Sequence, residues 1–294
     1  ENNEDWLKKQ EVVTRGEYDT IDEMMNVEGV HSSYIYSNDA QFQVAEFLTA
    51  SKIGEEASFY SFEPYEASNR WQIGSNAKII PNETDKIIDA KIGLSSLKIS
   101  NGVGLQNSFT PQNQQQDYVF SSYVKLPDGF DSSKGNVKWI LSFTQNGNTV
   151  GQDILLSFGE QVGSWTYLFK VFNLKEIGAN NNPITVTIKA QNDNTQSPVL
   201  VDCIRFSPLH SLFSSVSINQ EIDVVESSLG SNGEIQTKFF DDYQRVVSNT
   251  SFAEKTAAMA TNYFSRTGND NAFSITDPNS KLKLLAVDGG DAVR

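Results

Sequence analysis

Residues 58–208 consist of short segments rich in β-branched and aromatic residues, separated by Gly, Asn, Asp and Pro turns. About ten such segments follow one another, which is typical of a β-sandwich or barrel. The expected strands are 58–63, 71–73, 77–80, 96–100, 117–126, 137–145, 153–158, 165–172, 184–191 and 199–206. No long segment with a period of 3.6 residues interrupts them, which argues against a parallel α/β sheet. The sequence therefore predicts an all-β fold with a sandwich over 58–208.

The flanking segments show weaker patterns. Residues 1–57 contain extended patterns at 11–15 and 32–36. Residues 41–51 show a helical spacing, with Phe42, Ala45 and Leu48, or else Val44 and Phe47, on one face. In residues 209–294, segments 234–240 and 244–248 predict a hairpin around Asp241 and Asp242. A helix is expected at 252–265, with a strand at 259–264 as the alternative, and a last strand at 281–287. We therefore expect three parts, at 1–57, 58–208 and 209–294.

Charge and cysteine content exclude several functions. The formal charge is −14 and the pI about 4.6, so the net field repels nucleic acid. The acidity favours solubility, with divalent-cation binding at one or two sites as the alternative. Cys203 is the single cysteine, so no intramolecular disulfide can form, and a lone cysteine on a strand is usually buried. No apolar run approaches the ~20 residues that span a bilayer. The first residues, Glu-Asn-Asn-Glu-Asp, do not resemble a signal peptide, and we expect the sequence to be a segment of a longer polypeptide.

Short motifs at the two ends of the expected sandwich are similar to a known fold. Ser-Phe-Glu at 61–63 opens it, Val-Asp-Cys-Ile-Arg-Phe at 201–206 closes it, and Gly-Ser-Trp-Thr-Tyr at 163–167 lies between. Together they resemble the carbohydrate-binding-module type of jelly roll, also called galactose-binding-like. Cys203 departs from the second Asp that such modules carry. The resemblance covers about half of the chain and implies a fold that hosts many binding roles.

A second resemblance concerns the flanks. Residues 233–247 (GEIQTKFFDDYQRVV) are similar to a YD repeat of the Rhs type, with Phe240-Asp241 in place of Tyr-Asp and Gln244 in place of Gly. Residues 22–36 resemble the spacer that precedes such a jelly roll in large bacterial Rhs-like proteins. The order of spacer, sandwich and YD hairpin implies a segment of a secreted or surface-displayed bacterial protein. The paired Asp-Pro-x-Gly self-cleavage motif is absent, since 277–280 (DPNS) do not match it.

The jelly-roll resemblance also implies a structural Ca²⁺ site. In such modules a Glu from the first strand and an Asp from the last often meet at one edge, so Glu63 and Asp202 are the candidate ligands. Asp85 and Asp89 could add side-chain oxygens, because hard cations need several oxygens at one point. The plainer alternative is that Glu63 accepts hydrogen bonds from nearby backbone N–H groups and that Asp202 caps a strand end.

A sugar site would need exposed aromatic rings flanked by hydrogen-bonding groups. The candidates are Trp71 with Arg70 beside it, Tyr65 and Tyr118. The alternative for each Trp is burial in the core, because a large ring with a polar tip buries well in a sandwich. We expect that burial for Trp139 and Trp165, which lie in apolar strand patterns.

No recognisable motif supports catalysis. His31 and His210 are the only histidines and lie far apart without a cysteine cluster, which argues against zinc and against a Ser-His-Asp site. No acidic pair lies in a motif that fixes a glycosidase geometry. We therefore expect a non-catalytic binding or adhesion segment whose partner is a glycan or a cell-surface protein. The alternatives are a structural spacer and, less favoured, a polysaccharide-active enzyme.

Overall fold

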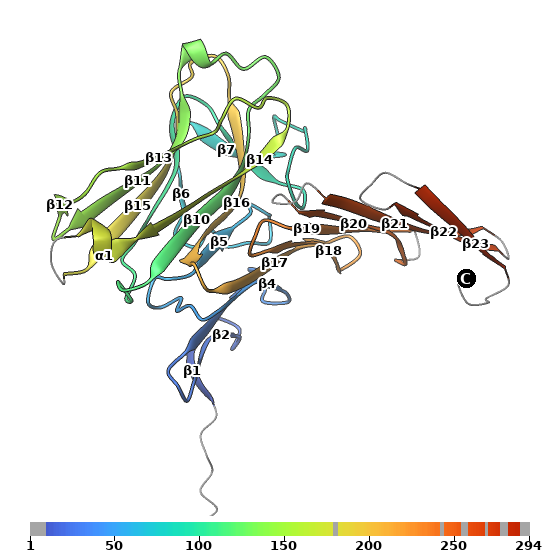
Figure 1. Ribbon diagram of the computed structural model, residues 1–294, viewed down its shortest axis with the longest axis horizontal. Helices are drawn as coiled ribbons and strands as arrows, with labels where there is room; N and C mark the ends of the chain where they lie inside the picture. The colour runs from blue at the N-terminus through green and yellow to red at the C-terminus, as the bar shows by residue number, and fades with distance from the viewer. Residues whose placement is uncertain are drawn as a thin grey trace, which may run out of the picture. The chain divides into compact units, whose positions relative to one another are not determined.

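The computed structural model describes residues 10–178, 182–241, 244–253, 258–267, 270–276 and 282–288, with side chains through Ser251. The chain forms two compact units, one ending at Phe213 and the other beginning at Ser214. The first unit holds the sandwich and a small N-terminal sheet, and the second is a succession of antiparallel strands (Figure 1). The all-β prediction is confirmed.

The sandwich consists of two antiparallel sheets, named here after their central strands. The β10 sheet has the order β14-β10-β16-β8-β7, with β5 also paired to β16. Its strands are β5 (Ser58–Tyr60), β7 (Ala77–Ile80), β8 (Ser96–Ile99), β10 (Asp117–Lys125), β14 (Trp165–Asn173) and β16 (Val199–Pro208). The β11 sheet has the order β12-β11-β15-β9-β6, with β13 paired to β11. Its strands are β6 (Gln72–Ile73), β9 (Gly102–Phe109), β11 (Val137–Gln145), β12 (Asn148–Thr149), β13 (Ile154–Ser157) and β15 (Ile184–Asn192).

Strict alternation of side chains places the core between the two sheets. Along β11 the buried and half-buried positions alternate without a break, and Trp139, Leu141 and Phe143 face inward. The ring of Phe206, in the β10 sheet, stacks on that of Tyr118 in the same sheet, with centroids 5.2 Å apart, and on that of Phe109 in the β11 sheet, at 4.4 Å. This packing of large rings explains why the sandwich needs no disulfide. Two short helices, η1 (Ser132–Lys134) and α1 (Leu174–Ile177), lie in its connections.

The N-terminal sheet contains β1 (Gln10–Arg15), β2 (Ile21–Asn26), β3 (His31–Tyr36) and β4 (Gln43–Leu48), each antiparallel to the next. The strands expected at 11–15 and 32–36 are confirmed, but the helix expected at 41–51 is wrong because β4 occupies it. A register shift between Ile35 and Tyr36 lets the adjacent residues Val44 and Ala45 both be buried. Because of this irregularity, the sequence of β4 lacks the alternation of apolar and polar residues by which a strand is recognised.

The second unit is a meander in which each strand pairs with its neighbours in sequence. Its strands are β17 (Leu212–Asn219), whose first two residues are counted in the first unit, β18 (Val224–Gly230), β19 (Ile235–Phe240), β20 (Val246–Ala253), β21 (Ala258–Thr267), β22 (Asp270–Thr276) and β23 (Leu282–Asp288). The expected hairpin at 234–248 and the last strand are confirmed, apart from residues 242–243 and Lys281, which lie outside the described residues.

The helix expected at 252–265 is wrong over its described residues, and the alternative strand at 259–264 is confirmed. Strand β21 pairs with β20 on one side and β22 on the other. Its Thr, Tyr and Phe residues suit a pleated strand. Two ladders of backbone hydrogen bonds thus outweigh the helical propensity of its alanines. Residues 254–257 of the expected helix are not described.

Candidate functional site

The opening and closing strands of the sandwich lie side by side. Strand β5 pairs antiparallel with β16, with Tyr60 opposite Ile204. Glu63 follows β5 and is 2% exposed, and Asp202 lies within β16 and is 0% exposed. The pairing of β16 with β10 shifts register here, and Cys203 adopts a φ of 50°. This bulge re-aims the side chains of the closing strand.

One loop, residues 91–95, holds both carboxyl groups through its backbone. Oε1 of Glu63 accepts hydrogen bonds from the N–H groups of Leu94 (3.0 Å) and Ser95 (2.9 Å). Oδ2 of Asp202 accepts them from Lys91 (2.7 Å) and Ile92 (3.3 Å). The loop therefore connects Glu63, which follows the first strand, to Asp202, which lies in the last strand. We call Glu63, Asp202 and the loop at 91–95 the carboxyl clamp.

Burial makes the charged forms of these acids costly. It raises the pKa of Glu63 to about 8 and that of Asp202 to about 8. Glu66, which is bound by the N–H and hydroxyl groups of Ser61 at 2.8 and 2.6 Å, has its pKa raised to about 7 by the same cause. Cys203 is 1% exposed, as expected of a lone cysteine, and burial also raises the pKa of its thiol.

The carboxyl clamp does not offer an obvious oxygen shell for Ca²⁺. Oδ1 of Asp202 accepts the N–H of Cys203 at 2.6 Å, so three of the four carboxyl oxygens of Glu63 and Asp202 already have amide donors. The additional ligands suggested by sequence are also engaged, because Asp85 pairs with Lys98 (2.6 Å) and Asp89 with Lys125 (2.8 Å).

Among the described residues, no group of three or more His, Cys, Asp or Glu side chains is arranged to hold a metal ion. Glu63 instead shows the backbone hydrogen bonds of the plainer alternative, whereas Asp202 lies inside its strand and does not cap a strand end. Ca²⁺ binding at Glu63 and Asp202 stays a prediction.

The aromatic residues proposed from sequence as a sugar platform are buried. Trp71, Tyr65 and Tyr118 are 3%, 6% and 0% exposed. Trp71 donates its indole N–H to Ser58 Oγ at 3.1 Å, and Tyr118 donates to the carbonyl of Asn113 at 2.7 Å. Arg70 is exposed but pairs with Glu55 at 2.6 Å. These rings pack inside the protein and are not exposed, so the expected sugar platform at Trp71, Tyr65 and Tyr118 is wrong.

A different set of aromatic residues lies at the surface, on the edge strand β14. Trp165, Tyr167 and Phe169 pair with Lys125, Tyr123 and Ser121 of β10, whereas Phe172, in the opposite phase, joins the core. Alternation therefore directs the three rings to the outer face of the β10 sheet. Phe169 is 50% exposed, and Trp165 and Tyr167 are half-buried. We call these three residues the β14 row.

Neighbouring rings contact Tyr167 and Phe169 of the β14 row. The rings of Tyr167 and Phe169 stack with centroids 6.1 Å apart, and Tyr167 contacts Tyr123 at 5.0 Å. The ammonium of Lys91 lies over the ring of Tyr123 at 4.7 Å. Trp165 is half-buried and does not belong to the core cluster, so it lies outside the core in which sequence placed it. The surface combines apolar rings with a charged group, Lys91, beside them.

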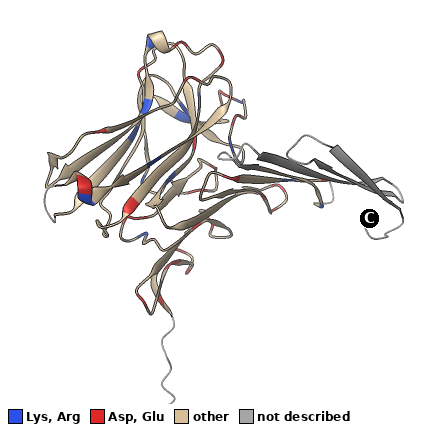
Figure 2. Cartoon of the chain, in the orientation of Figure 1, with Lys and Arg blue, Asp and Glu red and all other residues tan. Residues whose placement is uncertain are grey.

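Charge is dispersed over the rest of the unit. Figure 2 shows lysine and arginine residues scattered among acidic ones along the described part of the sandwich. The described residues include no helix with the length and apolar character of a membrane span.

Comparison with known proteins gives structural neighbours only. No protein-family model matches the chain, and no curated protein matches it. A family 22 xylan-binding domain from Paenibacillus barcinonensis is 16% identical, covering 51% of this chain and 92% of that one with a TM-score of 0.34. A family 22 carbohydrate-binding module from Clostridium thermocellum is 14% identical, covering 53% and 94% with a TM-score of 0.36. A family 61 module in complex with β-1,4-galactotriose is 13% identical, covering 50% and 90% with a TM-score of 0.30.

Proposed function

We propose that the sandwich is a non-catalytic glycan-binding module and that the β14 row is its contact surface. The observation that carries the proposal is the exposure of Phe169 beside the half-buried rings of Trp165 and Tyr167 on one face of an edge strand. A pyranose ring presents C–H groups on its faces and hydroxyl groups around its rim. Flat aromatic side chains with polar neighbours suit both features.

The geometry also fits a ligand longer than one sugar. Residues two apart on a strand are about 6.6 Å apart along its axis, and the three rings follow one another at that repeat. Lys91 and Lys125 lie next to this surface, near Tyr123 and opposite Trp165 respectively. The row therefore offers successive stacking positions to the repeating units of a polysaccharide, with charged groups alongside.

A structural spacer is the second candidate, and Trp165 distinguishes the two. A pure spacer predicts that every Trp is buried, and Trp71 and Trp139 are 3% and 0% exposed. Trp165 is not, since it is half-buried on the outer face of β14. Trp6 lies outside the described residues. The exposure of Trp165 favours a binding role.

The cellular setting forms part of the proposal. The hairpin of β19 and β20 coincides with the YD-like segment of the sequence. We infer a segment of a large Rhs-like bacterial protein that is secreted or displayed on the cell surface. In that setting the β14 row contacts glycans of a cell surface or matrix, and a surface protein is the alternative partner.

The test is binding of the full chain to a glycan array and to insoluble polysaccharides. We expect Trp165→Ala to weaken the affinity for any retained glycan by about tenfold, corresponding to ~1.4 kcal/mol, because a stacking surface is removed. The matched control is Leu155→Ala, which removes a residue that is 59% exposed on strand β13 of the other sheet. Equal affinities for the wild type and Trp165→Ala, or no retention by any glycan, would contradict the proposal.

A further inference from the structure

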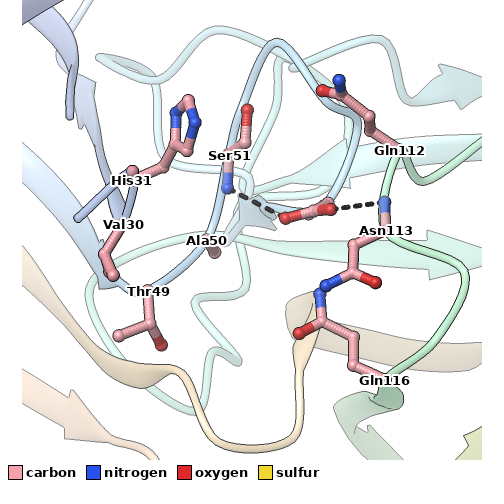
Figure 3. Close-up of a pocket in the computed structure, with 10 residues that line it drawn as sticks. Val30, His31, Thr49, Ala50, Ser51, Gln112, Asn113 and Gln116 are labelled. Carbon is pink, nitrogen blue, oxygen red and sulfur yellow. Dashed lines mark hydrogen bonds between the residues drawn. The ribbon is translucent and has the colours of Figure 1, made fainter.

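A cavity elsewhere in the first unit has the features of a binding site. It has a volume of about 590 Å³ and is lined by residues 29–31, 49–51, Glu56, 112–113 and Gln116 (Figure 3). These come from the turn between β2 and β3, the segment after β4 and the loop between β9 and β10. A volume of this size lies in the range of small-molecule sites.

Buried carboxyl groups hold the walls of this cavity together. Glu56, which is 7% exposed, accepts the N–H of Asn113 at 2.8 Å and the N–H of Ser51 at 3.3 Å, so it connects two of the three segments. Glu23, which is 0% exposed, lies 2.6 Å from Nδ1 of His31 and accepts the hydroxyl of Ser51 at 2.8 Å. The polar wall is therefore organised before any ligand arrives.

Thr49 lines the cavity in a strained conformation. Its φ is 69°, in the left-handed region that a β-branched residue rarely adopts. A glycine would be relaxed at this position but would have no hydroxyl group. Strain of this kind collects at functional sites, and here it places a hydroxyl-bearing side chain on the cavity wall.

The available hydrogen-bonding atoms define the ligand. Within the described part of the chain, Nε2 of His31, Oγ1 of Thr49, the carboxamide of Gln112 and Oε1 of Gln116 form no hydrogen bond. This set mixes donors with acceptors, as a hydroxyl-rich ligand requires, since each hydroxyl group both donates and accepts. No Lys or Arg lines the cavity, and the carboxyl groups of Glu56 and Glu23 disfavour an anion.

We propose that this cavity binds a small, neutral, hydroxyl-rich molecule of the size of one or two sugar units. It shares no residue with the β14 row, so the inference does not rest on the proposed function. A module that engages a polysaccharide through its outer face would then also carry a separate site for a short saccharide or a chain end.

The experiment is an NMR titration of the full, ¹⁵N-labelled chain with lactose and xylobiose as neutral probes and glucuronate as the anionic control. We expect the side-chain amide signals of Gln112, Asn113 and Gln116 to shift with the neutral probes and not with glucuronate. Gln112→Ala should weaken binding about fivefold, as expected for the loss of one hydrogen bond. The matched control, Gln115→Ala, changes an exposed residue of the same loop that does not line the cavity.

Thr49→Gly separates a binding role from a structural one. Relief of the positive φ should raise the thermal stability of the chain. Loss of the hydroxyl group should weaken the affinity for the neutral probes about fivefold. Unchanged affinity in both Gln112→Ala and Thr49→Gly would overturn the inference. So would shifts confined to the β14 row, which would leave the proposed function standing, and so would glucuronate binding as tightly as the neutral probes.

Discussion

Raising the pH from about 4 to about 8 in metal-free buffer is expected to lower the free energy of unfolding of this chain by about 3 kcal/mol. Glu63 and Asp202 have folded-state pKa values raised to about 8. Their stabilising effect is therefore complete below the unfolded-state pKa and is lost as pH rises through the folded-state pKa. One pKa unit is worth about 1.4 kcal/mol. A difference of about one unit between the folded-state and unfolded-state pKa of each of the two carboxyl groups is therefore enough to produce this change.

Urea titrations at several pH values measure this slope. Glu63→Gln keeps an oxygen to accept the N–H groups of Leu94 and Ser95 but cannot ionise, so it should flatten the dependence. Asp85→Asn is the control, because Asp85 pairs with Lys98 and its pKa is lowered, chiefly by that hydrogen bond. A stability that rises between pH 5 and pH 8 in the wild type would show that the amide donors outweigh burial.

The same titration tests the predicted Ca²⁺ site. A cation bound at Glu63 and Asp202 would favour their ionised forms, so added Ca²⁺ would restore stability at pH 8 and have little effect at pH 4. Stability that is independent of Ca²⁺ at pH 8 would assign the carboxyl clamp to hydrogen bonding alone.

Gly93→Ala is expected to destabilise the sandwich by about 3 kcal/mol, through strain and through loss of the carboxyl clamp. Gly93 has a φ of +67°, and a Cβ there would lie 2.3 Å from Oε1 of Glu63. That oxygen cannot move without giving up the N–H groups of Leu94 and Ser95. Thermal or urea unfolding of the variant gives the change in free energy.

Gly129 offers a closely matched control. It has a similar φ of +77°, but nothing lies within 4 Å of the place where its Cβ would be. Gly129→Ala should therefore lose only the backbone contribution, about 1 kcal/mol. Equal losses in the two variants would show that the contact between Gly93 and Glu63 does not contribute to stability.

The strands of the sandwich could be predicted where alternation was strict or the turns were clear. Strands β7 and β11 have the limits that their patterns indicate. Strand β9 was missed because Gly102 and Gly104 interrupt its apolar residues, and glycine usually weakens a strand. Gly104 is tolerated because its missing side chain makes room for Ile99, whose Cγ2 would lie 2.4 Å from an added Cβ.

The candidate sites were harder to predict, because they depend on contacts between distant segments. Trp71 stands beside polar residues, yet its ring packs against Phe109 at 5.8 Å and is buried. The segment 165–172 has apolar residues on both faces, so alternation alone could not tell which face lies outside. The register with β10 decides this, and the cavity near Thr49 unites three segments that no local pattern relates.

The pairing of β5 with β16 has a consequence for how the chain folds. Tyr60 and Ile204 lie near opposite ends of the sandwich sequence, and the loop at 91–95 must close on Asp202 as well as on Glu63. During synthesis, neither contact can form until the last strand has left the ribosome. Folds dominated by such distant pairings are slow to form, on the scale of milliseconds to seconds. Until then the edge of β10 and the carboxyl groups of Glu63 and Asp202 would remain in water. The negative charge of the ionised carboxyl groups would oppose premature association of chains.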